Sequence, residues 1–319
     1  MILTPNIITI EIIDTIFVVL TTYIFFVSIQ ILRYWDKNSF STRQYQLQMK
    51  SYLAATVVRF IFYVKIPLFL FFIYTLDHLA VLLPGAMCGA GVVNATIYGT
   101  PLLFVKILNL YLFAFWLVLD KEDRLSKEQK YTKVKFILYC IAFGTFISEM
   151  LLEFSMFSSI DIQHVVDCCG VIFSTTAQTY LSEILALQPE VHVGLFYTLY
   201  VIILIGYFRH NRYVFSIANF FFVLSALISL IAIFGTYIYE LPTHHCPFCM
   251  LQKEYFSIGY FLYTFLFIGT FFGIVVGLLF LDKRKEKRYF LYSLIANTLY
   301  VIIVSFYPIS YYIKNGVWL

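Results

Sequence analysis

The chain has 319 residues, of which 61% are hydrophobic, 20% aromatic and only 13% charged. A mean hydropathy of +0.84 exceeds what a water-soluble domain can bury, so the composition excludes a soluble globular protein. The net charge of +4 comes from short basic clusters between apolar runs, and we expect no nucleic-acid partner. We predict an all-α polytopic membrane protein in contact with membrane lipid.

Eight apolar runs are long enough to cross a bilayer, which takes about 20 mostly apolar residues. In chain order they lie near residues 7–32, 53–77, 100–119, 134–157, 191–208, 213–239, 255–281 and 289–311. Lys and Arg are concentrated in the connections 33–52, 120–136, 209–212 and 282–288. The positive-inside rule places these connections in the cytoplasm and both termini outside.

The start of the chain carries two acidic residues within its first apolar run. Glu11 and Asp14 interrupt this run, and no basic segment precedes it, so we expect no cleavable signal peptide. We expect both side chains to be solvated near the outer boundary of the membrane. Two basic residues of the second run, Arg59 and Lys65, are expected to reach the interface or to form ion pairs.

Two glutamates of the fourth run, Glu149 and Glu153, are four positions apart and therefore share one face of a helix. A carboxylate inside a membrane is costly and is usually paired or functional. Lys106 of the third run is the expected counter-charge. The pattern leaves open a structural ion pair, a proton path for quinone chemistry and a cation site.

Five of the six cysteines fall on the expected outer side, and the sixth, Cys140, lies within a span as a small packing residue. In a bacterium the outer side is the periplasm, where disulfides persist. Thiols gathered there are paired, catalytic or bound to metal. The five are Cys88, Cys168, Cys169, Cys246 and Cys249.

The motif Cys-Pro-Phe-Cys at 246–249 stands where a polar segment meets the seventh apolar run. Because Pro favours the first position of a helix, we predict that Cys246 is the N-cap of this helix and Cys249 its third residue. The positive end of the helix dipole would then favour the thiolate form of both sulfurs. A low-pKa thiolate is a good leaving group in disulfide exchange, so the motif favours a redox-active dithiol.

Three segments resemble the vitamin K epoxide reductase family. The run 168–174, Cys-Cys-Gly-Val-Ile-Phe-Ser, resembles its loop motif Cys-Ser-x-Val-x-x-Ser, and 189–197 resembles the Pro and Gly-x-x-Tyr stretch of its second helix. The motif at 246–249 is similar to its active-site dithiol. The likeness covers about 134–281, and it extends more loosely to the DsbB-type enzymes.

The resemblance implies a four-helix bundle around a quinone, ubiquinone or menaquinone, in the bacterial inner membrane. Cys249 matches the residue that meets the quinone ring, and Cys246 matches the residue that exchanges with the loop. Cys168 matches the loop shuttle thiol, and Ser174 matches the loop hydroxyl. The implied partner is a periplasmic thioredoxin-like protein that oxidises secreted proteins.

The resemblance also divides the chain and indicates a cofactor site. It implies an N-terminal three-helix membrane region at 1–133, a redox core at 134–281 and a C-terminal transmembrane helix at 282–319. The expected quinone-binding residues neighbour the dithiol or match the Gln and basic residue that follow it in DsbB-type enzymes. They are Phe248, Gln252, Lys253 and Tyr255.

The chain departs from the family at the loop. The family has a second loop cysteine upstream of its Cys-Ser motif, and residues 158–167 contain none. Cys169 occupies the position of the family's Ser. The loop pair is therefore Cys168 with Cys169, or one of these with Cys88 from another loop.

Two other functions remain open. Vicinal cysteines, a Cys-x-x-Cys motif and adjacent histidines are also ligands for copper(I), zinc or mercury, so the chain could bind or transport a soft metal. The ligands would be Cys168, Cys169, His244, His245, Cys246 and Cys249. Alternatively, the chain is a non-catalytic membrane subunit of a larger complex. The balance favours an enzyme, a quinone-dependent thiol–disulfide oxidoreductase.

Overall fold

A computed structural model describes residues 4–36, 41–126, 129, 131–162, 165–166, 187–279 and 282–319. The described residues form helices and connections, without any strand. Eight helical spans within them are long and apolar enough to cross a membrane, which confirms the all-α polytopic class. Seven of the eight predicted runs lie inside one of these spans, and the other, 255–281, starts before its helix does.

The long helices in the first part of the chain are α1 (Pro5–Tyr34), α2 (Thr42–Ala80), α4 (Gly99–Leu125) and α5 (Thr132–Ser159), with the short α3 (Gly89–Asn94) between α2 and α4. The second part contains α8 (Pro189–Phe208), α9 (Arg212–Ser229), α11 (Ile258–Leu278) and α12 (Lys283–Asn315). A π-helical turn, Leu230–Phe234, joins α9 to α10 (Gly235–Tyr239). Two 3₁₀ turns, Cys249–Leu251 and Lys253–Tyr255, precede α11.

The chain divides into two compact units. Unit 1 comprises Met1–Pro84 and Val92–Val166, and unit 2 comprises Gly85–Gly91 and Asp167–Leu319. The fourth span, α5, therefore packs within unit 1 and α12 within unit 2, whereas the resemblance groups residues 134–281 together. The redox core at 134–281 therefore stays a prediction that rests on the resemblance alone.

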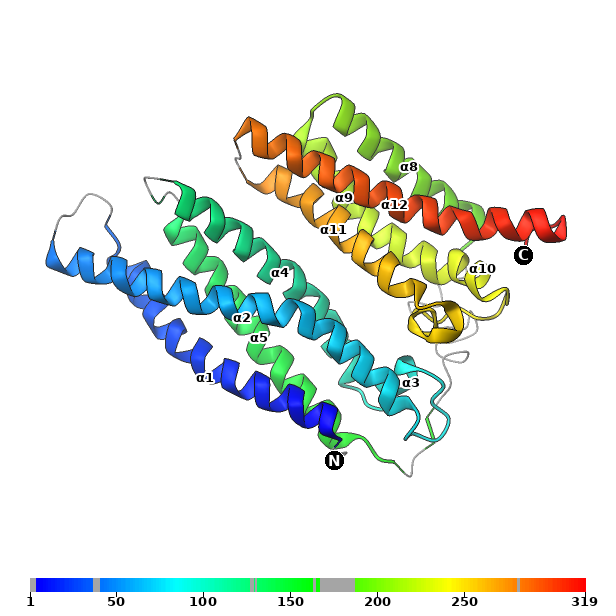
Figure 1. Cartoon of the computed structure of the whole chain (residues 1–319), viewed down its shortest axis with the longest axis horizontal. Helices are drawn as coiled ribbons and strands as arrows, with labels where there is room; N and C mark the ends of the chain where they lie inside the picture. The colour runs from blue at the N-terminus through cyan, green and yellow to red at the C-terminus, as the bar shows by residue number, and fades with distance from the viewer. Residues whose placement is uncertain are drawn as a thin grey trace. The chain divides into compact units, whose positions relative to one another are not determined.

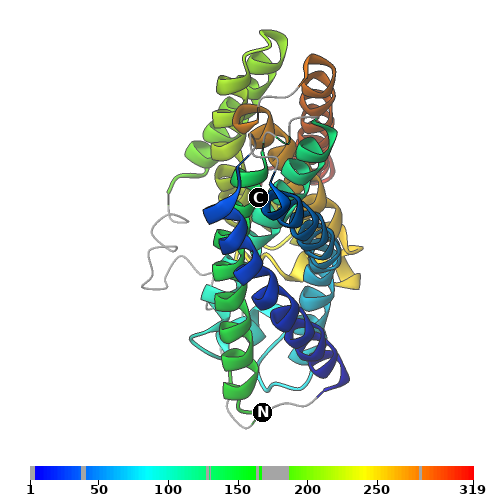
Figure 2. The ribbon, with the colours of Figure 1, turned by 90° about the vertical axis from the view of Figure 1, so that its left-hand side faces the viewer.

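Unit 1 is a bundle of four helices, in which α1 and α4 each pack against both α2 and α5. Helices α1 and α5 lie side by side in both views (Figures 1 and 2). Aromatic rings fill its centre: Phe62 stacks on Phe113 with ring centroids 4.2 Å apart and meets Trp116 edge-on at 5.4 Å. The Trp116 indole donates a hydrogen bond to the carbonyl of Lys135, so its polar group is satisfied inside the core.

The charged residues inside unit 1 are paired with one another. Lys106 contacts both Glu149 and Glu153, as predicted. Arg59 pairs with Asp120, and Lys65 pairs with Asp14, which confirms pairing for both bases. The solvated position expected for Asp14 is wrong: its side chain is buried, because Lys65 draws it into the bundle.

Unit 2 is a second bundle, in which α9 packs against α8 and α11, and α11 packs against α12. Glycines of α11 allow the close approach of its neighbours: a Cβ added at Gly273 would lie 2.2 Å from Asn219 of α9, and one at Gly269 would lie 2.1 Å from Asn297 of α12. The Asn297 amide donates to the Asn219 side chain at 2.7 Å. Small residues and buried amides together hold these membrane helices in contact.

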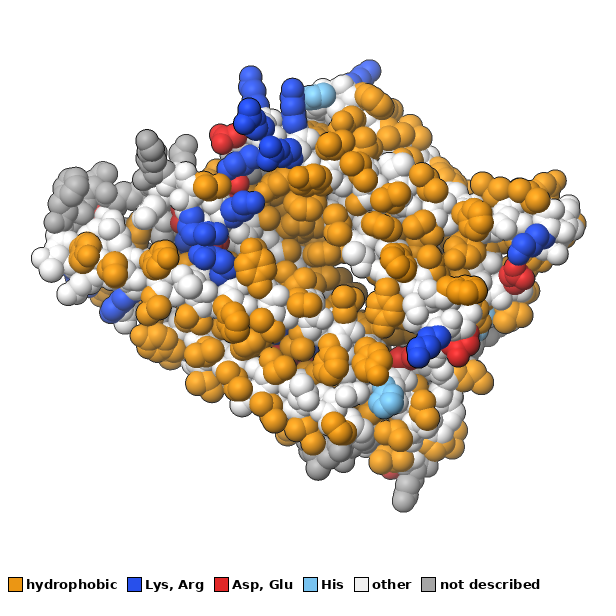
Figure 3. Space-filling model, in the orientation of Figure 1, with side chains coloured by type: hydrophobic (Ala, Val, Ile, Leu, Met, Phe, Trp, Pro, Cys, Tyr) orange, Lys and Arg blue, Asp and Glu red, His pale blue; other side chains and the backbone are white. Residues whose placement is uncertain are grey.

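The surface agrees with a membrane environment. Hydrophobic side chains cover most of the face shown in Figure 3. In unit 1, Lys121 and Arg124 stand at the C-terminal end of α4, and in unit 2 a run of Lys and Arg opens α12. This separation of apolar flanks from basic helix ends is typical of transmembrane bundles.

Candidate functional site

Three cysteines of unit 2 meet at one place. Cys88 lies just before α3, whereas Cys246 and Cys249 lie between α10 and α11. The sulfur atoms of Cys88 and Cys246 are 3.4 Å apart, and all three sulfurs lie within 4.8 Å of one another. The three residues are buried, with exposures of 0% for Cys88, 1% for Cys246 and 5% for Cys249.

The hydroxyl group of Tyr239, at the end of α10, holds the first turn of the cysteine motif. It donates a hydrogen bond to the carbonyl oxygen of Cys246 and accepts one from the backbone N–H of Met250 at 3.0 Å. In an α-helix starting at this point, the Met250 N–H would bond directly to the Cys246 carbonyl. The tyrosine hydroxyl therefore takes the place of the first helical hydrogen bond.

The prediction that Cys246 caps the seventh transmembrane helix is consequently wrong. In such a helix the Pro247 carbonyl would accept from the N–H of Leu251. Instead, the Pro247 carbonyl accepts from the Tyr263 hydroxyl at 2.7 Å, and the Leu251 N–H donates to the Phe248 carbonyl in a 3₁₀ turn. Helix α11 begins only at Ile258. Neither cysteine belongs to the first turn of α11, so the predicted stabilisation of their thiolates by its dipole does not follow.

The segment between the motif and α11 contains two residues in the left-handed region. Phe256 and Ser257 have φ angles of 55° and 52°, which few residues other than glycine adopt. They turn the chain from the 3₁₀ turns into α11. The turn positions the cysteine motif as a separate loop at the end of the bundle.

The π-helical turn before α10 contributes a further anchor. His245 contacts the carbonyl oxygen of Ile231 through Nδ1 at 2.9 Å. A carbonyl oxygen only accepts, so Nδ1 is the protonated nitrogen of this ring. A π turn interrupts the regular hydrogen-bond ladder, and the histidine that precedes the dithiol bonds to one of its carbonyls.

The four residues expected to bind a cofactor have different surroundings. Gln252 donates from its amide to the Met87 carbonyl at 3.0 Å and so joins the loop of Cys88 to the cysteine motif. Lys253 is exposed, and Phe248 is buried. The ring of Tyr255 meets the Tyr239 ring edge-on at 4.7 Å. Partial burial, then the neighbouring Cys249 and Glu254, raise the pKa of the Tyr255 hydroxyl.

The structure describes some of the remaining predicted residues and not others. Cys168, Cys169 and Ser174 lie outside the described residues, so their predicted roles are not tested. His244 packs edge-on against the Tyr239 ring at 4.5 Å. Cys140 lies in α5 of unit 1, in agreement with its expected place inside a span.

Sequence reasoning missed Tyr239. In a chain with 26 tyrosines, one more at the end of an apolar run carries no signal of its own. Its role depends on the return of the chain at 246–250 to the end of α10, and this return is a tertiary feature. Cys88 was among the predicted residues, but its particular contact with Cys246 could not be selected from the sequence.

Three clustered thiols allow two kinds of chemistry. Sulfur atoms 3.4 Å apart are within a small side-chain rotation of the roughly 2.05 Å bond of a disulfide, so exchange among the three is geometrically accessible. The same three sulfurs match the soft ligands that bind copper(I) or zinc.

Comparisons with known proteins add no assignment. The chain matches no protein family model, and neither a curated protein sequence nor a solved structure is significantly similar to it.

Proposed function

We propose that the protein is a membrane thiol–disulfide oxidoreductase whose electron relay includes Cys88, Cys246 and Cys249. The contact of 3.4 Å between the Cys88 and Cys246 sulfurs carries this proposal, because thiol–disulfide exchange requires a thiolate next to the sulfur that it attacks. Cys249 lies within reach of both. In a bacterial inner membrane, the positive-inside orientation would put these thiols on the periplasmic face.

The relay starts from the Cys246–Cys249 disulfide. The Cys88 thiolate attacks the Cys246 sulfur, so that a Cys88–Cys246 bond forms, the Cys246–Cys249 bond breaks and Cys249 leaves as a thiolate. Cys249 can re-form its bond with Cys246 in the reverse exchange. These exchanges move the disulfide among the three sulfurs without net oxidation.

Net turnover needs a reductant and an oxidant. A dithiol of a periplasmic thioredoxin-like partner reduces the relay disulfide: it becomes a disulfide itself and supplies two electrons and two protons. A bound quinone, ubiquinone or menaquinone, accepts two electrons and two protons from the dithiol and becomes the quinol. Phe248 and Met250, which flank Cys249 in the chain, are both buried and give it apolar neighbours.

Access to the relay requires local movement. All three sulfurs are shielded from solvent, and a partner protein cannot reach them in this arrangement. The loop thiols of Cys168 and Cys169, which the resemblance gives the shuttle role, would connect the partner to Cys88 or Cys246. Cys168 and Cys169 would then exchange with the partner protein, and the three buried cysteines would pass the electrons on to the quinone.

The test is quinone reduction by the purified full-length protein, with dithiothreitol as the reductant and a short-chain ubiquinone analogue as the oxidant. We expect the Cys246→Ser and Cys249→Ser variants to lose at least 100-fold in rate and the Cys140→Ser variant to keep it. A wild-type rate equal to that of folded Cys249→Ser protein would contradict the proposal.

A second candidate, a soft-metal carrier, is favoured by the same three sulfurs. Their mutual separations suit a three-coordinate copper(I) site, and their burial would exclude competing water. Metal analysis after loading with copper(I) discriminates. One tightly bound equivalent that protects all three thiols from alkylation, together with no quinone reduction, would favour the carrier.

A further inference from the structure

All four helices of unit 1 contribute to one buried charge cluster. Lys65 lies 3.0 Å from Asp14 and 2.9 Å from Glu149. Lys106 lies 2.8 Å from Glu149 and 2.7 Å from Glu153. Each of these five residues is at most 5% exposed. The cluster therefore stands in the low-dielectric interior of a membrane bundle, away from water.

The cluster holds more acids than bases. It contains three carboxyl groups and two ammonium groups, and full ionisation would leave one uncompensated negative charge. The ammonium groups stay charged, because each is bonded to two carboxylates and faces an aromatic ring, Phe146 for Lys65 and Phe72 for Lys106. An unpaired charge buried in this way is very costly, so the cluster requires one further positive charge.

A metal ion does not fit this requirement. The carboxylate oxygens of Asp14, Glu149 and Glu153 approach within 4.8 Å of one another, which resembles a cation site. However, the ammonium nitrogens of Lys65 and Lys106 already occupy the positions between these oxygens. Two ammonium groups would repel a metal ion, whereas a proton needs only one carboxylate oxygen.

The hydrogen bonds identify the carboxyl group that takes the proton. Both oxygens of Asp14 accept from Lys65, and the two oxygens of Glu149 accept from the lysines and from Asn109. Glu153 accepts from Lys106 through Oε2, and its buried Oε1 has no hydrogen-bond partner among the described residues. Glu153 is 1% exposed, so this oxygen is the available position for a proton.

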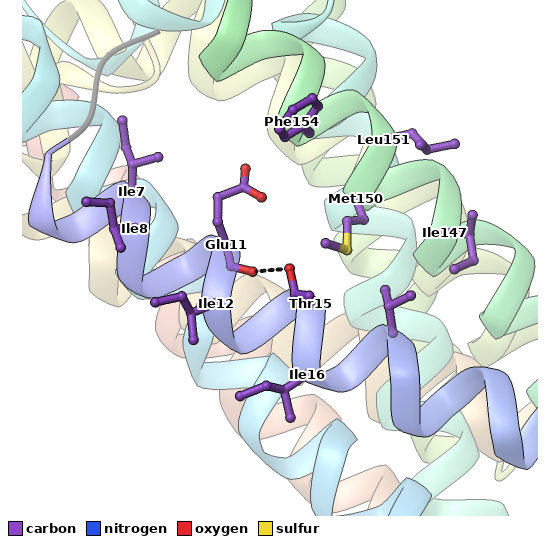
Figure 4. Close-up of a pocket in the computed structure, with 11 residues that line it drawn as sticks. Ile7, Ile8, Glu11, Ile12, Thr15, Ile16, Ile147, Met150, Leu151 and Phe154 are labelled. Atoms are coloured by element: carbon purple, nitrogen blue, oxygen red, sulfur yellow. Dashed lines mark hydrogen bonds between the residues drawn. The ribbon is translucent and has the colours of Figure 1, made fainter.

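A groove of about 660 Å³ lies between α1 and α5. Its lining is almost entirely apolar, and Glu11 is its one charged residue. Figure 4 shows the Glu11 carboxyl group extending from α1 into the space that Met150 and Phe154 of α5 border. Glu11 lies on the same helix as Asp14 and is close enough to Asp14, Lys65 and Lys106 for their charges to act on it, so it connects the groove to the cluster.

We propose that Glu153 binds one exchangeable proton inside unit 1 and that Glu11 relays this proton through the groove between α1 and α5. The charged groups around Glu153 are Lys106 of α4, Glu149 of its own helix, Asp14 of α1 and Lys65 of α2. Their net charge without Glu153 is zero, so protonated Glu153 completes a neutral cluster. The site belongs to unit 1 alone and does not depend on the cysteine relay.

Infrared spectroscopy of the full-length protein tests the proton on Glu153. We expect a protonated-carboxyl band at neutral pH that shifts in D₂O and is absent in Glu153→Gln. Glu153→Asp should retain a band, and Glu190→Gln, which alters an exposed acid, should change nothing. Absence of such a band from the wild type, its persistence in Glu153→Gln, or its removal by sodium or magnesium ions would overturn the proposal.

The exchange rate of the band in D₂O tests the route. Glu11→Gln should keep the band but slow its isotope shift at least ten-fold, because the relay carboxyl is gone while the binding site remains. An unchanged rate in Glu11→Gln would contradict the route. Loss of the band in Glu11→Gln, with its retention in Glu153→Gln, would place the proton on Glu11 instead. Even where a variant fails to fold, absence of the band from the wild type would overturn the first part of the proposal.

Discussion

The sulfur atom of Cys88 lies 3.4 Å from that of Cys246, although 158 positions separate the two residues in the chain. Two connections at the same end of unit 2 bring them together, and the hydrogen bond from Gln252 to Met87 fixes one connection against the other. This contact distinguishes the arrangement from an isolated Cys-x-x-Cys pair. It makes Cys246 a sulfur with two thiol neighbours.

The contact predicts a specific cross-link. Mild oxidation of Cys249→Ser protein should give a Cys88–Cys246 disulfide in most molecules, because these two sulfurs need only a small rotation to bond. Peptide mapping by mass spectrometry without reduction measures it. The Cys246→Ser variant should give neither this bond nor the Cys246–Cys249 bond. Recovery of Cys88 mainly in bonds to other cysteines would contradict the prediction.

Tyr239→Phe should loosen the cysteine motif. The change removes the hydroxyl that pairs the Cys246 carbonyl with the Met250 N–H and leaves two buried backbone groups without it. We expect a loss of about 1–3 kcal/mol in local stability, seen as faster alkylation of the buried thiols. Tyr237→Phe is the matched control, since the Tyr237 ring packs against Tyr311 of α12. Equal alkylation rates in both variants would refute the role of Tyr239.

Gly273→Ala should destabilise unit 2. The added methyl group would lie 2.2 Å from the Asn219 side chain, which is itself held by a hydrogen bond to Phe215. Overpacking of this kind costs about 1–3 kcal/mol. Thermal denaturation in detergent, followed by circular dichroism, measures the effect. Gly194→Ala is the control, because no atom beyond its chain neighbours and its own helix backbone lies within 4 Å of its added methyl group.

Lys106→Met should destabilise unit 1 strongly. It leaves Glu149 and Glu153 without their shared ammonium group in a buried position, and breaking a buried pair from one side costs about 3–5 kcal/mol. Lys314→Met disrupts an exposed pair with Glu240 and should cost about 0–1 kcal/mol. Denaturation by sodium dodecyl sulfate compares the two. Similar losses for both variants would show that the buried cluster contributes no special stability.

The sequence predicted the spans well because apolar length is a local property. Lipid requires every backbone group of a span to be bonded within its own helix, so a run such as 213–239 becomes helical whatever surrounds it. The pairing of Lys106 with Glu149 and Glu153 was equally predictable, since buried charges in a membrane require partners.

The start of the seventh helix was mispredicted for a definite reason. Pro247 is well suited to a first helical position, but hydroxyl groups from Tyr239 and Tyr263 bond to the carbonyls that a helix would use. Tertiary hydrogen bonds therefore override the local preference. The buried state of Asp14 was missed in a similar way, because its partner Lys65 lies on another helix.

The sequence by itself determined that lipid surrounds this protein, where its spans lie and that cysteines fall between them, because composition and hydropathy act over short stretches of chain. Only the tertiary structure decided that Cys88 contacts Cys246 and that a tyrosine hydroxyl replaces the first helical hydrogen bond of the cysteine motif. It also decided that one buried oxygen of Glu153 has no hydrogen-bond partner among the described residues. These features depend on which side chains face each other across a bundle, and helix packing sets that choice.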